Sequence, residues 1–277
     1  MKLATIRTSE GTAAVRVEDA TLTELGAVDV GQLLRNPEWR QVAAKGGGRV
    51  HDVATANFAP LIPEPSKVVC VGLNYRNHIL EMGRELPEFP TLFAKYSEAL
   101  IGAHDPIMLA PESDSVDWEA ELAVIIGSTV RRARGSSAEH AIGGFAILND
   151  VTMRDWQYRT PIWDQGKTWE STTPLGPYFV TPDELPGGVR PALELSCSVN
   201  GEIVQQANTS DLVFDPVALV EYVSTIITLR PGDVIATGTP GGVGHARKPA
   251  RYLAGGDILV THIAGLGVAE NQAVKEQ

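Results

Sequence analysis

The chain has 277 residues, of which 43% are hydrophobic and 21% are charged, a composition typical of a folded globular protein rather than a disordered one. Its formal net charge is −11 at pH 7, so we expect neither nucleic acid nor an anionic membrane as a partner. An acidic protein that binds an acidic small molecule needs a local cation, either basic side chains or a metal ion. Cys70 and Cys197 form no C-x-x-C pair, which excludes a disulfide framework and a cysteine-built zinc site.

The N-terminal sequence also bears on location. Its first twenty residues are charged from the start and lack the apolar core of a signal peptide. No apolar run in the chain approaches the roughly 18–20 residues of a membrane-spanning helix. We therefore expect a cytoplasmic protein.

The first sixty residues predict a small N-terminal unit. Residues 1–8 and 12–17 alternate polar and apolar side chains around a Glu-Gly dipeptide, which indicates a β-hairpin. Three prolines within residues 60–66 cannot continue a helix or a central strand, so they mark the best boundary. We predict a small β-containing domain over residues 1–62 and a catalytic domain over residues 63–277.

Short strands predominate beyond this boundary. Residues 67–73 form a continuous apolar run, typical of a strand buried on both faces, and Asn74 can cap a short helix over residues 75–82. Asp215 and Pro216 start a second helix over residues 217–227. Further strands are predicted over residues 91–95, 120–126, 144–148, 178–181, 193–200, 234–237 and 258–263. The dipeptide Asn200-Gly201 is typical of a β-hairpin turn. Strands outnumber helices and do not alternate with them, so we predict a strand-rich α+β fold whose sheet curls into a barrel or roll.

The most informative segment is DWEAELAVII at residues 117–126. Glu119 and Glu121 are two residues apart at the head of a predicted strand, so both side chains point to one face. Two carboxylates on a buried face repel each other, and a positive charge should lie between them. Asp150 ends another apolar run and would complete a set of three if that strand lies nearby. If these residues bind a metal, a ligand set of oxygens alone selects Mg²⁺, Mn²⁺ or Ca²⁺ over zinc. The alternative to a metal site is that the glutamates lie on a solvated strand face.

Two further segments have both a functional and an ordinary interpretation. His78 and Glu81 share one face of the predicted helix, where a carboxylate would orient an imidazole that acts as a base; the alternative is a chance pair on an exposed helix. The glycine-rich residues 238–244 form either a surface loop or a loop that lines a ligand pocket. The remaining histidines stand at no ligand spacing and are expected to bind no metal: His51, His104, His140, His245 and His262.

Six separated segments, in this order, together resemble the fumarylacetoacetate hydrolase family: KVVCVGLNYRNHILEM, DWEAELAVIIG, NDVTMRDWQ, GK, PLGP and GTPGGVG. The resemblance runs from about residue 67 to near the C-terminus. It implies a β-roll of mixed sheets preceded by a variable N-terminal extension. It also implies that Glu119, Glu121 and Asp150 bind Mg²⁺ or Mn²⁺, with Ca²⁺ as a further option.

The resemblance also assigns roles to other side chains. His78 and Glu81 would form a dyad that activates water on a segment that closes over the substrate, continued by residues 83–90 as a flexible lid. Arg154, Gln157 and Lys167 would bind the carboxylate and enolate oxygens of the substrate, and Lys167 would also take part in catalysis. Thr239 and Lys95 would contact the substrate as well, although Lys95 lies in FAKY where relatives often have FLKP.

The implied activity is divalent-metal-dependent hydrolysis of a C–C bond in an acylpyruvate, a 2,4-dioxo acid such as the fumarylpyruvate of gentisate-type aromatic catabolism. The alternative is an isomerase or decarboxylase that uses the same metal site on a 2-hydroxymuconate-like or oxaloacetate-like acid. A non-catalytic protein that binds small acids would lack the dyad, so the presence of His78 and Glu81 favours an enzyme. Its partner would be a small anionic oxo acid, and the resemblance implies a homodimer.

Overall fold

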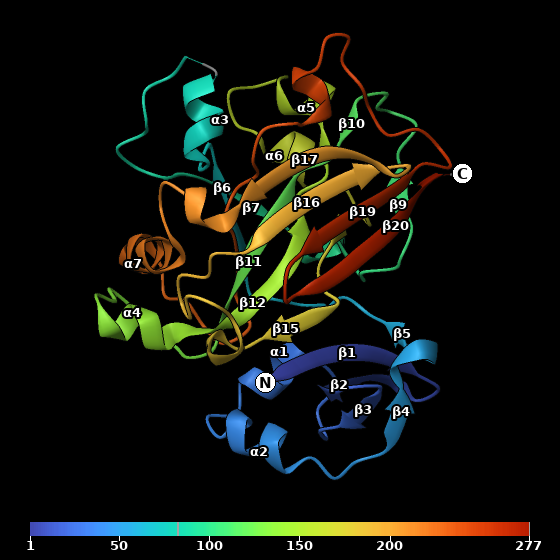
Figure 1. Cartoon of the computed structure of the whole chain (residues 1–277), viewed down its shortest axis with the longest axis vertical. Coiled ribbons are helices and arrows are strands. Elements are labelled where there is room, and N and C mark those ends of the chain that lie inside the picture. Colours follow the sequence, from blue (N-terminus) through green and yellow to red (C-terminus); the bar gives the residue numbers. More distant parts are fainter. Residues whose placement is uncertain (82, 277) are drawn as a thin grey trace.

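The computed structural model describes residues 1–81 and 83–276, and strands dominate its architecture (Figure 1). The largest sheet of the described chain has eleven strands. Its order is β4 (Val50–Asp52), β3 (Thr21–Glu24), β2 (Gly11–Glu18), β1 (Lys2–Thr8), β15 (Tyr178–Val180), β12 (Ile142–Asn149), β11 (Ala120–Ile126), β18 (Val234–Ala236), β6 (Val68–Gly72) and β7 (Thr91–Lys95), with β5 (Asn57–Phe58) paired to β1.

A second sheet packs beside the large one. Its order is β17 (Glu202–Asn208), β16 (Glu194–Val199), β19 (Ile258–Ile263), β20 (Gly267–Lys275) and β9 (Ile107–Leu109). Two short ribbons pair β10 (Val116–Asp117) with β13 (Thr152–Met153), and β14 (Thr173–Pro174) with β8 (Leu100–Ile101). The pairs β18–β6, β20–β9 and β14–β8 are parallel, whereas the other pairs between these strands are antiparallel, so the sheets are mixed.

The helices are short and lie around the sheets (Figure 1). They are α1 (Val30–Leu34), α2 (Trp39–Lys45), α3 (Arg76–Glu81), α4 (Ser136–Ala141), α5 (Arg154–Gln157), α6 (Asp164–Lys167) and α7 (Pro216–Ile226). Within the described residues, no helix has the length and apolar character needed to cross a membrane. Together with the mixed sheets, these helices confirm the predicted strand-rich α+β fold.

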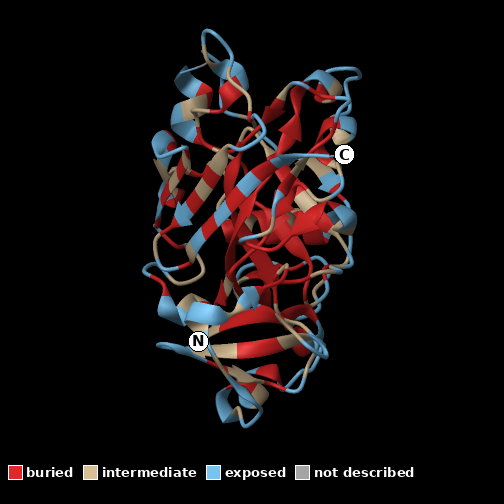
Figure 2. Cartoon of the chain, turned by 90° about the vertical axis from the view of Figure 1, so that its right-hand side faces the viewer, coloured by how far each residue is buried: buried red, intermediate tan, exposed pale blue. Residues whose placement is uncertain are grey.

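Strands β11 and β12 form the centre of the large sheet, and every residue of both is buried (Figure 2). The apolar residues of β11 alternate between two hydrophobic clusters, with Ala120, Leu122, Val124 and Ile126 in one and Ala123 and Ile125 in the other. Apolar packing on both faces explains why Glu121 is the only polar residue in this strand. A carboxylate there is costly to bury, so its position indicates a role other than packing.

The N-terminal hairpin forms as predicted, from β1 and β2. Strand β1 also pairs with β15, where Lys2 lies opposite Val180. The N-terminal strands therefore extend the large sheet at its lower end in Figure 1. The division into domains over residues 1–62 and 63–277 stays a prediction.

Two turn and capping signals in the second half of the chain are also confirmed. Asn200 and Gly201 join β16 to β17 with φ angles of 53° and 82°, the left-handed conformation that a two-residue hairpin requires. The carboxylate of Asp215 accepts a hydrogen bond of 2.9 Å from the N–H of Ala218, so it caps α7.

The predicted cap of α3 is wrong. The buried side chain of Asn74 donates to the carbonyls of Phe214 at 3.0 Å and Thr237 at 2.8 Å, and accepts from the N–H of Phe214 at 2.8 Å. The N–H of Asn77, in the first turn of α3, instead donates to the carboxylate of Asp211 at 3.0 Å. Asn74 therefore anchors the start of this helical segment to two distant loops. Met82, the last residue of the predicted helix, lies outside the described residues.

We expect Asn74→Ala to lower the free energy of unfolding by about 2–4 kcal/mol, because it leaves buried backbone groups of Phe214 and Thr237 without partners. The matched control is Asn77→Ala, an exposed change on the same segment that should cost about 0.5 kcal/mol or less. Denaturant unfolding of both variants gives the comparison. Equal losses would show that Asn74 does not anchor the segment.

Candidate metal centre and substrate cavity

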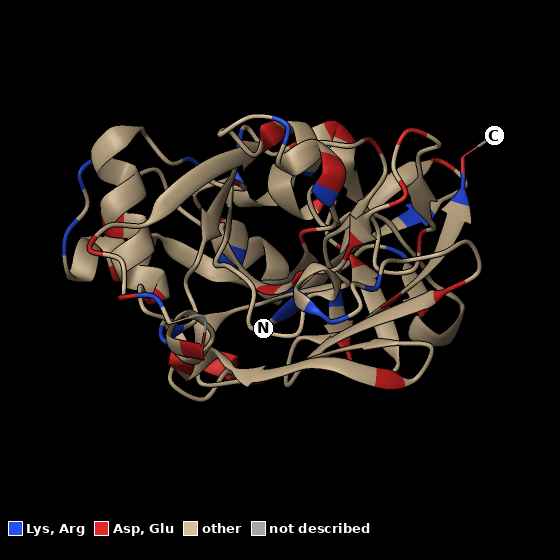
Figure 3. Ribbon diagram, turned by 90° about the horizontal axis from the view of Figure 1, so that it is seen from above, with Lys and Arg blue, Asp and Glu red and all other residues tan. Residues whose placement is uncertain are grey.

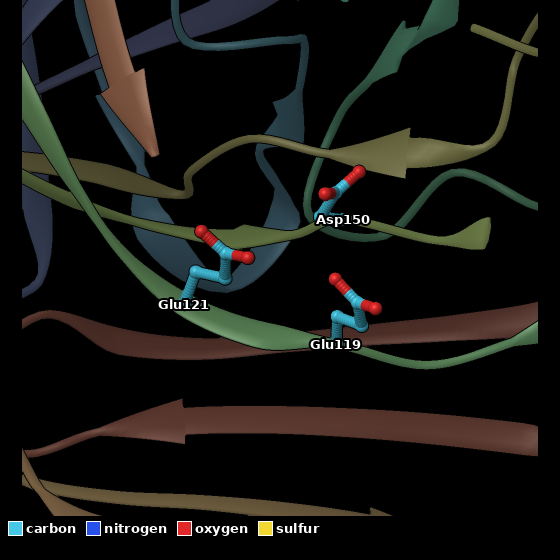
Figure 4. Close-up of side chains that lie close together, drawn as sticks. All are labelled: Glu119, Glu121 and Asp150. Carbon is cyan, nitrogen blue, oxygen red and sulfur yellow. The ribbon is translucent and has the colours of Figure 1, made fainter. Parts of the chain in front are cut away.

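Three carboxylates converge where β11 and β12 meet. Ala120 lies opposite Asn149 in the antiparallel pair, and the N–H of Asp150 donates to the carbonyl of Glu119 at 2.8 Å. Glu119, Glu121 and Asp150 are buried, and each offers an oxygen that lies within 4.8 Å of the others (Figure 4). The expectation that Asp150 joins the two glutamates is therefore confirmed.

Neighbouring groups fix the orientation of this carboxylate cluster. The N–H of Gly238 donates to Oε2 of Glu121 at 2.7 Å. Gly238 has a φ of 99°, and a Cβ added there would lie 2.9 Å from the carbonyl oxygen of Val71, so only glycine fits. The glycine-rich loop thus contacts the cluster directly, which favours the pocket-lining interpretation of residues 238–244.

Lys167 lies between two of the three carboxylates. This side chain, from α6, places Nζ 2.7 Å from Oε2 of Glu119 and 2.7 Å from Oδ2 of Asp150. Lys95, on β7, donates to Oδ1 of Asp150 at 2.7 Å and to the carbonyl of Val151 at 3.2 Å. Burial raises the pKa of Asp150, but the two lysines outweigh it, and the net effect is a pKa below the usual value. Lys167 therefore supplies part of the positive charge that the paired carboxylates require.

Glu121 is the carboxylate that these lysines leave uncompensated. Burial, followed by the charges of Asp150 and Glu119, raises the pKa of Glu121 well above its ordinary value. A divalent cation between the three groups would remove this repulsion, and an all-oxygen ligand set suits Mg²⁺ or Mn²⁺. The residues present therefore fit a hard divalent metal.

Asp117 holds Arg154 in place, a role that sequence reasoning missed. Its buried carboxylate accepts from Nε of Arg154 at 2.7 Å and from the N–H groups of Gly244 at 2.6 Å and His245 at 3.0 Å. The other guanidinium nitrogens of Arg154 reach Oε1 of Gln157 at 2.9 Å and Oε1 of Glu119 at 2.7 Å. Asp117 alternates with Glu119 and Glu121, and this D-x-E-x-E spacing is the signal that could have identified it.

A cavity of about 270 Å³ lies against this centre. Six residues singled out from the sequence line it: His78, Glu119, Arg154, Gln157, Lys167 and Thr239. Sequence reasoning missed other lining residues, among them Arg84, Phe93, Tyr158, Trp163 and His245. They come from separate elements, Phe93 from β7 and Tyr158 and Trp163 from the ends of α5 and α6, so only the fold brings them together.

Lys95 and Thr239 differ in whether they line the cavity. Lys95 is buried behind Asp150 and is not among the residues that line the cavity. Thr239 lines the cavity, but its hydroxyl already donates to the carbonyl of Ala120 at 3.0 Å and accepts from Nε2 of Gln205 at 2.8 Å. A direct contact of either residue with the substrate stays a prediction.

His78 lines the cavity from α3, and Glu81 lies on the same helix. A Cβ added to Gly241 would lie 3.0 Å from Nδ1 of His78 and 3.7 Å from Oε2 of Glu81, so both side chains lie beside this glycine. Burial lowers the pKa of His78, and the positive charge of Arg84 lowers it further. The negative charges of Glu81 and Glu119 raise it, but the net effect is a lowered pKa. The imidazole is therefore neutral at pH 7, the form that can accept a proton.

Comparison with known proteins identifies the family of the chain. A model of the fumarylacetoacetate (FAA) hydrolase C-terminal domain matches residues 67–274. A mitochondrial oxaloacetate tautomerase of Rattus norvegicus is 43% identical over 218 residues, which cover 78% of this chain and 69% of that relative. The chain belongs to the fumarylacetoacetate hydrolase family, which confirms the resemblance seen in its motifs.

Solved structures of the family match along the whole length of both chains. A fumarylacetoacetate hydrolase from the psychrophilic Exiguobacterium antarcticum has a TM-score of 0.86 and 30% identity, with 100% of each chain covered. A 5-carboxymethyl-2-hydroxymuconate delta-isomerase from Mycobacterium smegmatis has a TM-score of 0.83 and 34% identity, with the same coverage. The fold of the described residues, 1–81 and 83–276, is therefore that of the fumarylacetoacetate hydrolase family.

We expect Glu121→Gln to weaken Mn²⁺ binding about tenfold or more, because it removes a ligand charge while the amide oxygen can still accept from Gly238. Isothermal titration calorimetry with Mn²⁺ measures the change. Glu64→Gln, at an exposed position, is the matched control and should bind like the unaltered protein. Equal affinities for all three proteins would remove Glu121 from the ligand set.

Proposed function

We propose that the protein catalyses keto–enol isomerisation of an oxaloacetate-like 2-oxo acid at a divalent metal held by Glu119, Glu121 and Asp150. The observation that carries the proposal is one cavity lined both by Arg154, Gln157 and Lys167 beside the carboxylate cluster and by the neutral imidazole of His78. Two relatives are named as a tautomerase and an isomerase of oxo or hydroxy acids of this kind.

The cationic side chains would bind the acid end of the substrate. When bound, the metal supplies Lewis acidity, which stabilises negative charge on an enolate oxygen. Arg154 and Gln157 are held side by side by their mutual hydrogen bond, so they can donate N–H groups to a carboxylate from fixed positions. The ammonium of Lys167 lies at the cavity wall and adds a positive charge where the enolate forms.

His78 would move the proton. Isomerisation of a keto acid removes a proton from carbon 3 and adds one to the oxygen on carbon 2, so it needs a base but no water molecule as a reactant. The neutral imidazole of His78 can accept the proton from carbon 3, and its conjugate acid can return a proton in the reverse direction. Glu81, beside the same glycine as His78, would stabilise the protonated imidazole.

Hydrolysis of an acylpyruvate is the second candidate. The observation that favours it is the position of His78 and Glu81 together at Gly241, where the pair could activate water instead of removing a proton from carbon. Decarboxylation of oxaloacetate at the same site would also form an enolate but would need no base. The three reactions differ in their products, so product identification separates them.

We expect His78→Ala to lower kcat for oxaloacetate isomerisation by about 10²–10⁴, the usual contribution of one general base. The absorbance of the enol in the presence of Mg²⁺ follows the reaction. Because burial lowers the pKa of His78, kcat/KM of the unaltered enzyme should fall only at a pH below the ordinary pKa of histidine, where the imidazole becomes protonated. The matched control is His262→Ala, an exposed histidine on β19.

Two results would contradict this proposal. An unchanged kcat with a raised KM in His78→Ala would make His78 a binding residue rather than the base. Release of pyruvate from acetylpyruvate at a rate far above oxaloacetate isomerisation would favour the hydrolase instead.

A further inference from the structure

Three arginine and lysine side chains line the cavity: Arg84, Arg154 and Lys167. Arg154 is ion-paired with Asp117 and Glu119, and Lys167 with Glu119 and Asp150. Arg84 forms no ion pair with any carboxylate among residues 1–81 and 83–276. Of the three cations at the cavity, Arg84 is thus the one whose charge the described protein does not neutralise.

Arg84 comes from a different part of the molecule than the other two. It follows α3, and its N–H donates to the carbonyl of Ile79 at 3.2 Å, which ties it to the helix that carries His78. Arg154 and Lys167 belong to α5 and α6, beside the carboxylate cluster. The cavity therefore has one set of cations at the cluster and a separate cation on the segment of the proposed base.

We propose that Arg84 binds a second carboxylate of the substrate, distal to the 2-oxo acid end, so that the enzyme selects dicarboxylic 2-oxo acids. The inference rests on the proposed function and names its substrate class. A carboxylate that leaves water for a cavity loses its hydration, and a guanidinium can replace that hydration with two parallel hydrogen bonds. Oxaloacetate, the acid in the name of one relative, has such a second carboxylate.

The 4-methyl ester of oxaloacetate is the matched probe, because it keeps the 2-oxo acid and replaces the distal carboxylate with a neutral group. We expect Arg84→Gln to raise KM for oxaloacetate about tenfold or more and to change KM for the ester by about twofold or less. Arg84→Lys should retain part of the preference, since an ammonium keeps the charge but not the paired geometry.

The control variant is Arg76→Gln. Arg76 is an exposed arginine on the same helical segment, it does not line the cavity, and its loss changes the net charge equally. Both substrates should behave with this variant as they do with the unaltered enzyme. A general effect of charge near α3 would instead appear in Arg76→Gln and Arg84→Gln alike, and would overturn the assignment.

The remaining outcomes also decide the proposal. Equal changes for both substrates in Arg84→Gln would show that Arg84 acts through His78 or through the loop, not through a carboxylate. If the unaltered enzyme converts neither substrate, the proposed function fails, and calorimetric binding of oxaloacetate with Mg²⁺ then tests Arg84 separately. Binding to Arg84→Gln as tight as to the unaltered protein would overturn the inference whatever the activity.

Discussion

The structure depends on the balance of charge in one buried cluster. Four carboxylates are buried there, Asp117, Glu119, Glu121 and Asp150, against three buried cations, Lys95, Arg154 and Lys167. Removing one partner from such a group leaves an uncompensated charge and costs roughly 3–5 kcal/mol. The cluster therefore constrains the elements that supply it: the two central strands, β7, α5, α6 and the glycine-rich loop.

The same balance explains how an acidic protein can bind an acidic ligand. With every group ionised, the four carboxylates and three cations leave one negative charge in the cluster. A divalent metal bound there would change this to one positive charge. Elsewhere, the ribbon in Figure 3 shows Lys and Arg positions interspersed with Asp and Glu positions along the described chain. The attraction for an anion is therefore local, which agrees with a net charge of −11 for the chain.

The parts of the fold and site that the sequence predicted are those fixed by local patterns. The alternation of side-chain direction along a strand placed Glu119 and Glu121 on one face. Turn and capping residues located the hairpin at Asn200 and the start of α7. The contacts that it did not predict join distant positions: Lys95 with Asp150, 55 residues apart, and Asp117 with Gly244, 127 residues apart. The prediction that Asn74 caps α3 was wrong because of such a distant contact: backbone groups far along the chain compete with the local helix end for its side chain.

The sequence motifs also do not determine which reaction the protein catalyses. The carboxylate cluster and the His78–Glu81 pair suit hydrolysis and isomerisation alike, since both reactions use an enolate and a base. Other residues that line the cavity, such as Arg84 and His245, lie outside the six motifs and reach the cavity only in the folded chain. Loops and short turns around a fixed centre are where we expect the specificity of such a site to be set.

The metal that we propose for the carboxylate cluster would lie beside the cavity. Anomalous diffraction at the manganese edge, from crystals grown with Mn²⁺, tests it most directly. We expect one strong peak bounded by carboxylate oxygens of Glu119, Glu121 and Asp150. A peak elsewhere, or no peak while Lys167 still bridges Glu119 and Asp150, would contradict the account and leave the lysine as the only counter-charge between them.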